Sequence, residues 1–238
     1  GGLTFSYVNF DSDDSRLLFS ILKDFDCNFK TFSVNPFVGY ALADNLIVGM
    51  KLGYSHTIAD LVERFLKEKG NFGMDIVLSD EREKLLDTGG GVLRARELFI
   101  PGKPVLIHDV DILTDLDLKA LIYQHESHEA YATLVVQQTV ADRVLKFNHG
   151  ILKGWENKRT GEQKIVDEGF QGATEFNYCG IQILSPEYLK NIIHRGVFSI
   201  IDEHLAQAKD HPIELFRHDG QCLDLGTPEA IKKAAKNF

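Results

Sequence analysis

The first part of the chain alternates between hydrophobic and polar positions with a period of two. The run "TFSVNPFVGYALADNLIVGMKLGY" keeps this alternation from Thr31 to Tyr54, on both sides of a turn at residues 43–45. Because successive side chains of a strand point to opposite faces, the pattern predicts a β-hairpin with arms of about nine residues each.

From Ser55 onward, short apolar runs alternate with segments of helical spacing. Residues 55–66 carry apolar positions three and four apart, and Ser185 and Thr227 each precede a proline, as helix N-caps do. Strands that alternate with helices predict an α/β fold with a mostly parallel sheet. The expected strands are "MDIVLSD", "KPVLIHDVDIL", "YATLVVQQ", "VLKFN", "YCGIQILS" and "IELFRHD", and the expected later helices are "SPEYLKNII", "FSIIDEHLAQA" and "TPEAIKKAAK".

Composition narrows the class of protein. A hydrophobic content of 44% and a charged content of 26% suit a globular chain with a sizeable core, and the net charge of -9 argues against nucleic-acid binding. The three cysteines Cys27, Cys179 and Cys222 are odd in number and widely spaced, which indicates reduced thiols. With no signal peptide and no apolar run of membrane-spanning length in the sequence, we expect a cytoplasmic protein without a membrane span.

Acidic residues end the strand expected over "KPVLIHDVDIL". Asp109 and Asp111 fall there, and Asp224 stands just before a capped helix. In open α/β sheets ligands bind beyond the carboxyl ends of the strands, and Mg²⁺ takes one or two protein carboxylates. Two interpretations stay open: a metal site formed by Asp109 or Asp111 together with Asp224, or an Asp109 that only caps a turn and an Asp224 that only caps a helix.

Two further motifs are ambiguous by themselves. Gly89, Gly90 and Gly91 precede a helix that is expected to run through Leu98, and such glycines either approach a nucleotide or only turn the chain. The run "HESHE" from His125 to Glu129 lacks the HExxH spacing of a zinc site, so a solvated helix end or loop is favoured.

Several motifs together resemble one family. They occur in one order at ordinary spacings over about residues 55–238: "NFGMDIVLSDE…LLDTGGG", "PVLIHDVDILTDLDLKAL", "ATLVV", "LKGWENKRTGE", "YCGIQILSPE", "FSIIDEHL" and "CLDLGTPEAI". This part resembles the sugar-1-phosphate nucleotidyltransferases, in particular the bacterial mannose-1-phosphate guanylyltransferase-like and N-acetylmuramate-1-phosphate uridylyltransferase-like branches. The resemblance implies a Rossmann-like three-layer α/β/α fold with a mixed, mostly parallel sheet. It also implies nucleotide-sugar synthesis for the bacterial cell envelope.

The resemblance further implies a reaction and a site. The family condenses a nucleoside triphosphate with a sugar-1-phosphate, releasing pyrophosphate, with Mg²⁺ as cofactor. Matched by motif, Asp111 and Asp224 resemble the metal-binding and catalytic aspartates. The positions that resemble the nucleotide-binding segment are Thr88, Gly89, Gly90 and Gly91, and those that resemble the sugar-phosphate pocket are Glu156, Asn157, Lys158 and Gly180. A homo-oligomer is one option for its assembly.

Residues 1–54 depart from the family pattern. The family opens with a G-x-G-T-R loop and a following Pro-Lys pair that surround the triphosphate, whereas "GGLTFSYVNF" has no such arginine. This segment resembles a piece of an outer-membrane β-barrel instead. We therefore divide the chain into an atypical β-rich segment, 1–54, and a nucleotidyltransferase-like domain, 55–238. We expect impaired catalysis, and the alternative is an inactive nucleotide-sugar-binding or chimeric protein.

Overall fold

The computed structural model describes most of the chain after residue 75 and short pieces before it. The described residues are 3–6, 39–41, 45–47, 49–50, 64, 67–68, 70, 76–81, 84–109, 111–226, 230 and 234. The expected helices over 55–66 and 227–236, and Cys27, therefore lie wholly or largely outside the described residues. Among the described residues, no helix has the length and apolar character needed to cross a membrane.

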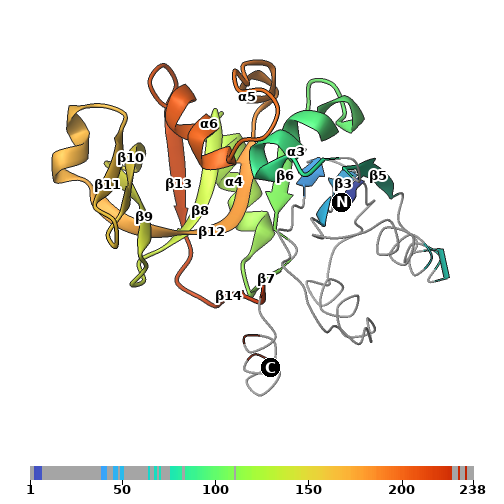
Figure 1. The fold of residues 1–238 in the computed structure, drawn as a ribbon, viewed down its shortest axis with the longest axis horizontal. Helices are drawn as coiled ribbons and strands as arrows, with labels where there is room; N and C mark the ends of the chain where they lie inside the picture. Colours follow the sequence, from blue (N-terminus) through green and yellow to red (C-terminus); the bar gives the residue numbers. More distant parts are fainter. Residues whose placement is uncertain are drawn as a thin grey trace.

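The described elements form a mixed α/β fold (Figure 1). The helices are α3 (Asp87–Ala95), η2 (Arg96–Leu98), α4 (Leu118–Ser127), η3 (Glu168–Gly172), α5 (Pro186–Lys190) and α6 (Ile200–Gln207). The strands are β1 (Leu3–Ser6), β2 (Gly39–Ala41), β3 (Asn45–Ile47), β4 (Gly49–Met50), β5 (Val77–Asp80), β6 (Val105–His108), β7 (Ile112–Thr114), β8 (Ala132–Gln137), β9 (Arg143–Asn148), β10 (Ile151–Asn157), β11 (Glu162–Ile165), β12 (Thr174–Leu184), β13 (Ile213–Arg217) and β14 (Cys222–Asp224).

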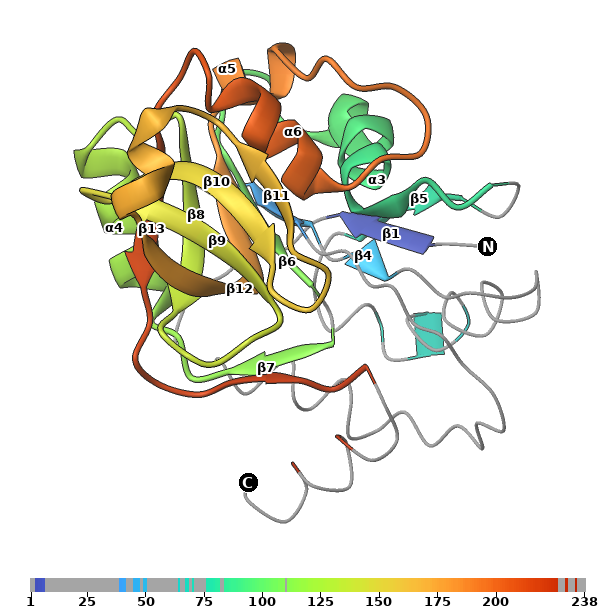
Figure 2. The same ribbon diagram turned by 60° about the vertical axis from the view of Figure 1, so that its left-hand side comes forward.

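The central strands bury both of their faces. Along β6, Val105 and Ile107 point into one apolar cluster and Leu106 points into another, as the two-residue period of a strand requires. The first cluster contains residues of α3, α5 and α6, and the second contains Leu121 of α4. Figure 2 shows α4 on the opposite side of these strands from α6. Helices on both faces explain why the strands read as continuous apolar runs.

Strand directions differ from the mostly parallel sheet that the sequence predicts. The order is β11-β10-β13-β8-β12-β6-β2-β3, and β13 with β8 is the one parallel pair among the described strands. The sheet is not mostly parallel because the long strand β12 lies between β6 and β8 and runs antiparallel to both. Its register shifts between Tyr178 and Gln182, around Gly180, whose φ of 68° suits glycine.

The sheet also closes on itself, which the expected Rossmann-like layers do not include. Strand β9 pairs with β10 on one side and with the first residues of β12 on the other. Together with β13 and β8, these strands make a closed five-stranded barrel, at the left of Figure 1. The mixed α/β sheet is thus confirmed, and a plain three-layer Rossmann arrangement is not.

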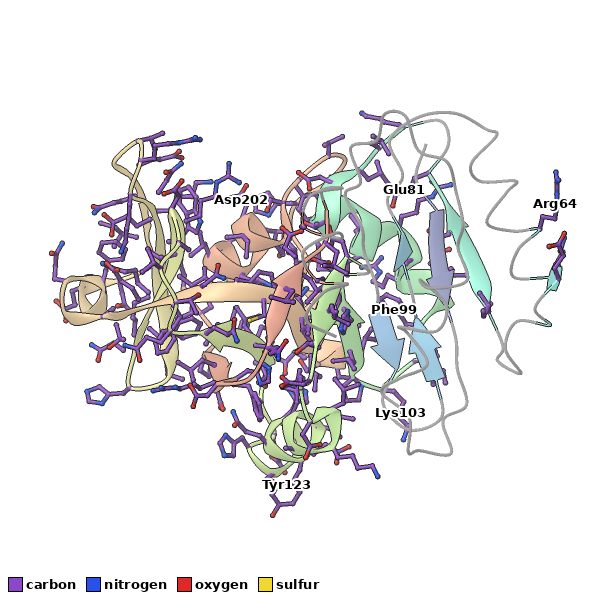
Figure 3. The ribbon with its side chains drawn as sticks, turned by 90° about the horizontal axis from the view of Figure 1, so that it is seen from below. Arg64, Glu81, Phe99, Lys103, Tyr123 and Asp202 are labelled. Carbon is purple, nitrogen blue, oxygen red and sulfur yellow. The ribbon has the colours of Figure 1, made fainter. Side chains whose placement is uncertain are left out.

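Lys164 of β11 contacts Asp202 of α6 at 2.6 Å (Asp202 is labelled in Figure 3).

The N-terminal segment contributes strands to two sheets. Strands β2 and β3 form an antiparallel hairpin across the predicted turn, with Tyr40 opposite Leu46. The hairpin joins the main sheet antiparallel to β6, so the segment supplies an antiparallel edge there. Within the predicted second arm, Gly49–Met50 pairs with β1, which also pairs with β5, and the rest of both predicted arms lies outside the described residues.

Several element boundaries differ from the sequence prediction. The run "KPVLIHDVDIL" is broken at Asp109, so β6 and β7 are separate strands. Strands β10 and β11 were not predicted, because "ILKGWENKRTGEQKI" is too polar to read as buried. Ser185 and Ser199 cap α5 and α6 through hydrogen bonds from Tyr188 N–H and Ile201 N–H, as the N-cap signal at Ser185 predicts.

Burial lowers the pKa of three described histidines, His108, His125 and His204, and keeps them neutral near pH 7. His204 is fully buried, with its Nδ1 beside the Tyr188 hydroxyl and its Nε2 beside Gln182 Oε1, and burial lowers its pKa to about 3. His125 was expected at a solvated helix end, yet it is buried against Thr133, and burial lowers its pKa to about 4. Tyr123 on the same helix α4 projects away from the body and is 74% exposed (Figure 3).

The buried histidines make the fold sensitive to acid. A histidine whose folded-state pKa is depressed contributes its full stability above the unfolded pKa of 6.5, and this contribution is lost as pH falls toward 4. We expect each histidine to steepen the loss by up to about 1.4 kcal/mol per pH unit. Urea unfolding at pH 7.5, 6 and 5 should show a shallower slope for His125→Gln, whereas the exposed control His149→Asn should keep the wild-type slope. An unchanged slope in His125→Gln would contradict the assignment.

The glycine-rich helix α3 packs too closely for side chains. A Cβ on Gly90 would lie inside 3.0 Å of the Gly196 carbonyl oxygen. Gly90→Ala should therefore lower the free energy of unfolding by about 1–3 kcal/mol, despite alanine's better helix propensity. Gly172→Ala is the control, because no heavy atom lies within 4 Å of a Cβ there. Thermal unfolding of both variants checks this, and equal stabilities would contradict it.

Candidate functional site

A two-stranded ladder brings Asp111 and Asp224 together. Strands β7 and β14 pair antiparallel, with Asp224 opposite Ile112, at the bottom of Figure 1. Asp111 stands immediately before β7, and Leu225 N–H donates to its carbonyl at 2.7 Å. Two residues 113 positions apart in sequence are thus neighbours, because the chain leaves β6 and β13 at the same edge and pairs beyond it.

The two carboxylates both lie close to Gly226. A Cβ on that glycine would lie 2.9 Å from Asp224 Oδ1 and 3.0 Å from Asp111 Oδ2. Gly226 N–H also donates to Asp224 Oδ1 at 2.7 Å, which orients that carboxylate. A glycine at this position is therefore needed to keep both carboxylates near one point. The sequence analysis missed Gly226, although its place two residues after Asp224 is the signal that could have found it.

The electrostatics of Asp111 are unusual for a carboxyl group. Burial, followed by the charge of the nearby Asp224, raises the pKa of Asp111 to about 7. Two like charges in a partly dehydrated place repel each other, and one of them then keeps its proton near neutral pH. A cation between them would remove this repulsion, and perturbed carboxyls of this kind gather at functional sites.

This pair fits a hard divalent cation such as Mg²⁺. Mg²⁺ takes one or two protein carboxylates and fills its other positions with water and phosphate oxygens. Within the described part of the chain, no group of three or more His, Cys, Asp or Glu side chains is arranged to hold a metal ion. The fit therefore rests on two carboxylates and a cradle that a Cβ would fill, and an all-protein metal cage is not built there.

The predicted nucleotide segment is part of a helix. Thr88 and Gly89–Gly91 lie in the first turns of α3, and the three glycines are buried. The N–H groups of Gly89 and Gly90 both donate to the Phe198 carbonyl, at 3.0 and 3.3 Å. The Thr88 hydroxyl accepts from Ile200 N–H at 3.0 Å. In this structure Gly89 and Gly90 pack closely against the segment that carries Phe198, and nucleotide binding by Thr88 and Gly89–Gly91 stays a prediction.

The predicted sugar-phosphate residues stand in a network of charges on the barrel. Glu156 of β10 contacts Lys146 at 3.1 Å and accepts from Gln163 at 3.1 Å. Lys146 also reaches Glu175 at 3.2 Å, and Glu175 in turn pairs with Lys158. These hydrogen bonds and charges hold the pKa values of Glu156 and Glu175 below their usual range. Both carboxylates are therefore ionised at neutral pH.

Asn157 and Gly180 have local structural roles. The Asn157 side chain accepts from Arg159 N–H at 3.1 Å and Thr160 N–H at 3.3 Å, which shapes the turn into β11. Gly180 lies against Asp109, whose Oδ2 would be 2.7 Å from a Cβ there, and against Ile112. Gly180 is thus close to the ladder that carries Asp111.

The structure brings some of the predicted residues together and not others. Asp111, Asp224 and Gly180 gather around β7. The glycines of α3 and the Glu156 network belong to other parts of the fold, with α3 at the upper right and β10 at the left of Figure 1. A nucleotide-sugar is long and has separate base, phosphate and sugar ends, so one ligand does not need all of these residues at one point.

Comparisons with known proteins show similarity at the level of fold. No protein-family model and no curated protein sequence matches the chain. HddC from Yersinia pseudotuberculosis, solved in complex with GMP-PN, is 21% identical with a TM-score of 0.50, over 66% of this chain and 64% of HddC. The chain therefore spans slightly less than two thirds of the length of HddC.

Two further solved structures carry names of one enzyme class. A Bacillus anthracis protein assigned as a glucose-1-phosphate thymidylyltransferase, solved with sucrose, has a TM-score of 0.57 and 17% identity over 76% of this chain and 71% of its own. A UDP-glucose pyrophosphorylase complexed with UDP-glucose has a TM-score of 0.50 and 16% identity over 76% and 75%. The described fold is thus similar to that of sugar-1-phosphate nucleotidyltransferases, as the motifs indicate.

The raised pKa of Asp111 leads to a stability prediction. A carboxyl whose folded-state pKa is raised stabilises the fold below the unfolded pKa of 3.8, and this contribution is lost as pH rises through about 7. Asp111→Asn removes the buried charge, so it should be more stable than the wild type at pH 8 by on the order of 2 kcal/mol. Urea unfolding at pH 8 and pH 5 measures this. A variant less stable than the wild type at pH 8 would show that the carboxylate is well paired.

Proposed function

We propose that the chain binds a nucleoside triphosphate with Mg²⁺ at Asp111 and Asp224 and transfers its nucleotidyl group to a sugar-1-phosphate. The products would be a nucleotide-sugar and pyrophosphate. The observation that carries the proposal is the pair of carboxylates at one end of the β7/β14 ladder, both beside the same Gly226. The likeness in fold to a glucose-1-phosphate thymidylyltransferase and a UDP-glucose pyrophosphorylase supports the choice of reaction.

The chemistry asks for positioning and charge neutralisation. A bound Mg²⁺ supplies positive charge to the phosphates. Asp111 and Asp224 would hold that ion, and because the pKa of Asp111 is about 7, Asp111 would release a proton as the ion binds. A sugar-1-phosphate is already an anionic nucleophile, so the proposed reaction needs no general base.

The Glu156 network is suited to bind the sugar-phosphate. Glu156 and Glu175 are acceptors for sugar hydroxyl groups, and Lys146 and Lys158 are donors for a phosphate. Lys146 has only 13% of its side chain exposed and is held between two carboxylates, so it is already oriented before a ligand arrives. Asn157 would support this network through the turn that it shapes, whereas Gly180 would act beside β7, close to Asp111.

A second candidate function is nucleotide-sugar binding without turnover. Two observations favour it. The sequence shows no G-x-G-T-R loop ahead of "MDIVLSD", and the Gly89 and Gly90 N–H groups are already hydrogen-bonded to the Phe198 carbonyl. The triphosphate would then have few backbone donors, and catalysis would be weak.

Calorimetric titration of nucleoside triphosphates with Mg²⁺ tests the proposed site. Asp224→Asn should weaken Mg²⁺-dependent binding by more than about 10-fold. Removing a residue that binds the ion directly should lower its affinity more than removing a residue that only supports such a ligand. The control is Asp219→Asn, a carboxylate on the neighbouring turn that is 70% exposed and paired with Arg217. If Asp224→Asn binds as the wild type does, the proposed metal site is wrong.

Pyrophosphate release separates the two candidate functions. Added sugar-1-phosphates should give slow release that Asp224→Asn abolishes if the chain is a transferase. Binding of a nucleotide-sugar without any release supports the second candidate.

A further inference from the structure

The β7/β14 ladder is a small sheet of its own. Its two strands pair only with each other among the described strands, and they are outside the nine-stranded sheet. One end of the ladder carries Asp111 and Asp224, and the other end continues into Asp115 on one strand and Gln221 on the other. Figure 2 shows the ladder running below the main sheet. Its position therefore depends on contacts other than strand pairing with the sheet.

Asp115 and Gln221 join the far end of the ladder. Gln221 N–H donates to Asp115 Oδ1 at 2.6 Å, and Asp115 N–H donates to the Gln221 carbonyl at 3.3 Å. The Thr114 hydroxyl donates to the same carbonyl at 2.8 Å. This reciprocal pairing fixes which residue of one strand faces which residue of the other.

His218 contacts the same group. Its Nε2 lies 3.0 Å from Asp115 Oδ1, 3.1 Å from the Gln221 carbonyl oxygen and 3.3 Å from Thr114 Oγ1. Because the first two of these atoms accept and the Thr114 hydroxyl already donates to Gln221, Nε2 must carry a hydrogen. Only 10% of the His218 side chain is exposed, so water competes little for these bonds.

The group is also tied to the central sheet. His218 N–H donates to the Val136 carbonyl of β8 at 2.9 Å. Gln137 of the same strand donates through Nε2 to the Gly220 carbonyl at 2.7 Å. A Cβ on Gly220 would lie within 3.0 Å of Asp115 Oδ1, so the group is closely packed. Through these bonds the far end of the ladder takes its place from a buried strand.

We propose that Asp115 and His218 are positioning residues for Asp224. They hold the register of β14 against β7 and thereby keep the Asp224 carboxylate beside Asp111. This inference rests on the proposed function, because it concerns the geometry of that metal site. A slip of one residue would move Asp224 by about 3.3 Å along the strand, whereas Mg²⁺ needs its oxygens at about 2.0–2.1 Å. Neither residue needs to touch the ion.

The first measurement is amide hydrogen exchange, which needs neither metal nor substrate. Leu225 N–H is bonded to the Asp111 carbonyl, so its exchange reports whether the two carboxylate-bearing segments remain together. Asp115→Ala should raise the exchange rate of Leu225 about 10-fold or more, while amides of the central strand β12 stay unchanged. Asp115→Asn keeps an oxygen that accepts from Gln221, so it should restore exchange to within about 3-fold of the wild type.

The second measurement is Mg²⁺ affinity in the presence of nucleotide. Asp115→Ala should weaken it about 10-fold or more, as loss of a supporting partner does in other metal sites, and Asp115→Asn should not. His218→Ala should act in the same direction as Asp115→Ala. The control is Asp219→Ala, which removes an exposed carboxylate from the same turn and should leave both readouts unchanged.

The outcomes distinguish this inference from the proposed function. If the wild-type chain binds no Mg²⁺-nucleotide, the proposed function fails, and exchange at Leu225 still decides whether Asp115 and His218 hold the two segments together. Unchanged exchange in Asp115→Ala overturns the inference. Faster exchange in β12 as well as at Leu225 overturns it too, because the role would then be general stability. Faster exchange at Leu225 with unchanged Mg²⁺ affinity would show that the register does not matter for the ion.

Discussion

The pairing of two short strands sets up the chemistry that this fold offers. Strands β7 and β14 are three residues each, yet they place two carboxylates from distant parts of the chain beside one glycine. Burial, followed by the charge of the nearby Asp224, raises the pKa of Asp111 to about 7 and produces a place where positive charge is favoured.

Such a pair costs stability, and the surrounding fold compensates for it. The central strands bury two apolar clusters, and a polar network fixes the helices above them. Glu203, which is fully buried, accepts from Ile193 N–H and His194 N–H, and Gln207 donates to it. These bonds hold the segment that carries Phe198 against α3. A rigid frame of this kind lets a repulsive pair persist at the edge of the sheet.

The sequence patterns predicted the elements better than their pairing. Apolar runs located β8, β9, β12 and β13, and the Ser185-Pro186 signal located the start of α5. Strands β10 and β11 were missed because their polar residues face a charged network and not an apolar core. Pairing direction could not be read either, since an antiparallel β12 between β6 and β8 has the same apolar composition as a parallel strand.

The sequence by itself determined the α/β class, most strand and helix positions after residue 75, and the acidic residues that could bind a metal. Only the tertiary structure decided which residues meet: Asp111 with Asp224, Gly89 and Gly90 with Phe198, and Glu156 with Lys146. The physical reason is that local patterns report burial and backbone preference, which act over a few residues. Contacts such as that between Asp111 and Asp224 depend on how strands far apart in sequence pair, and pairing is settled by the packing of the whole fold.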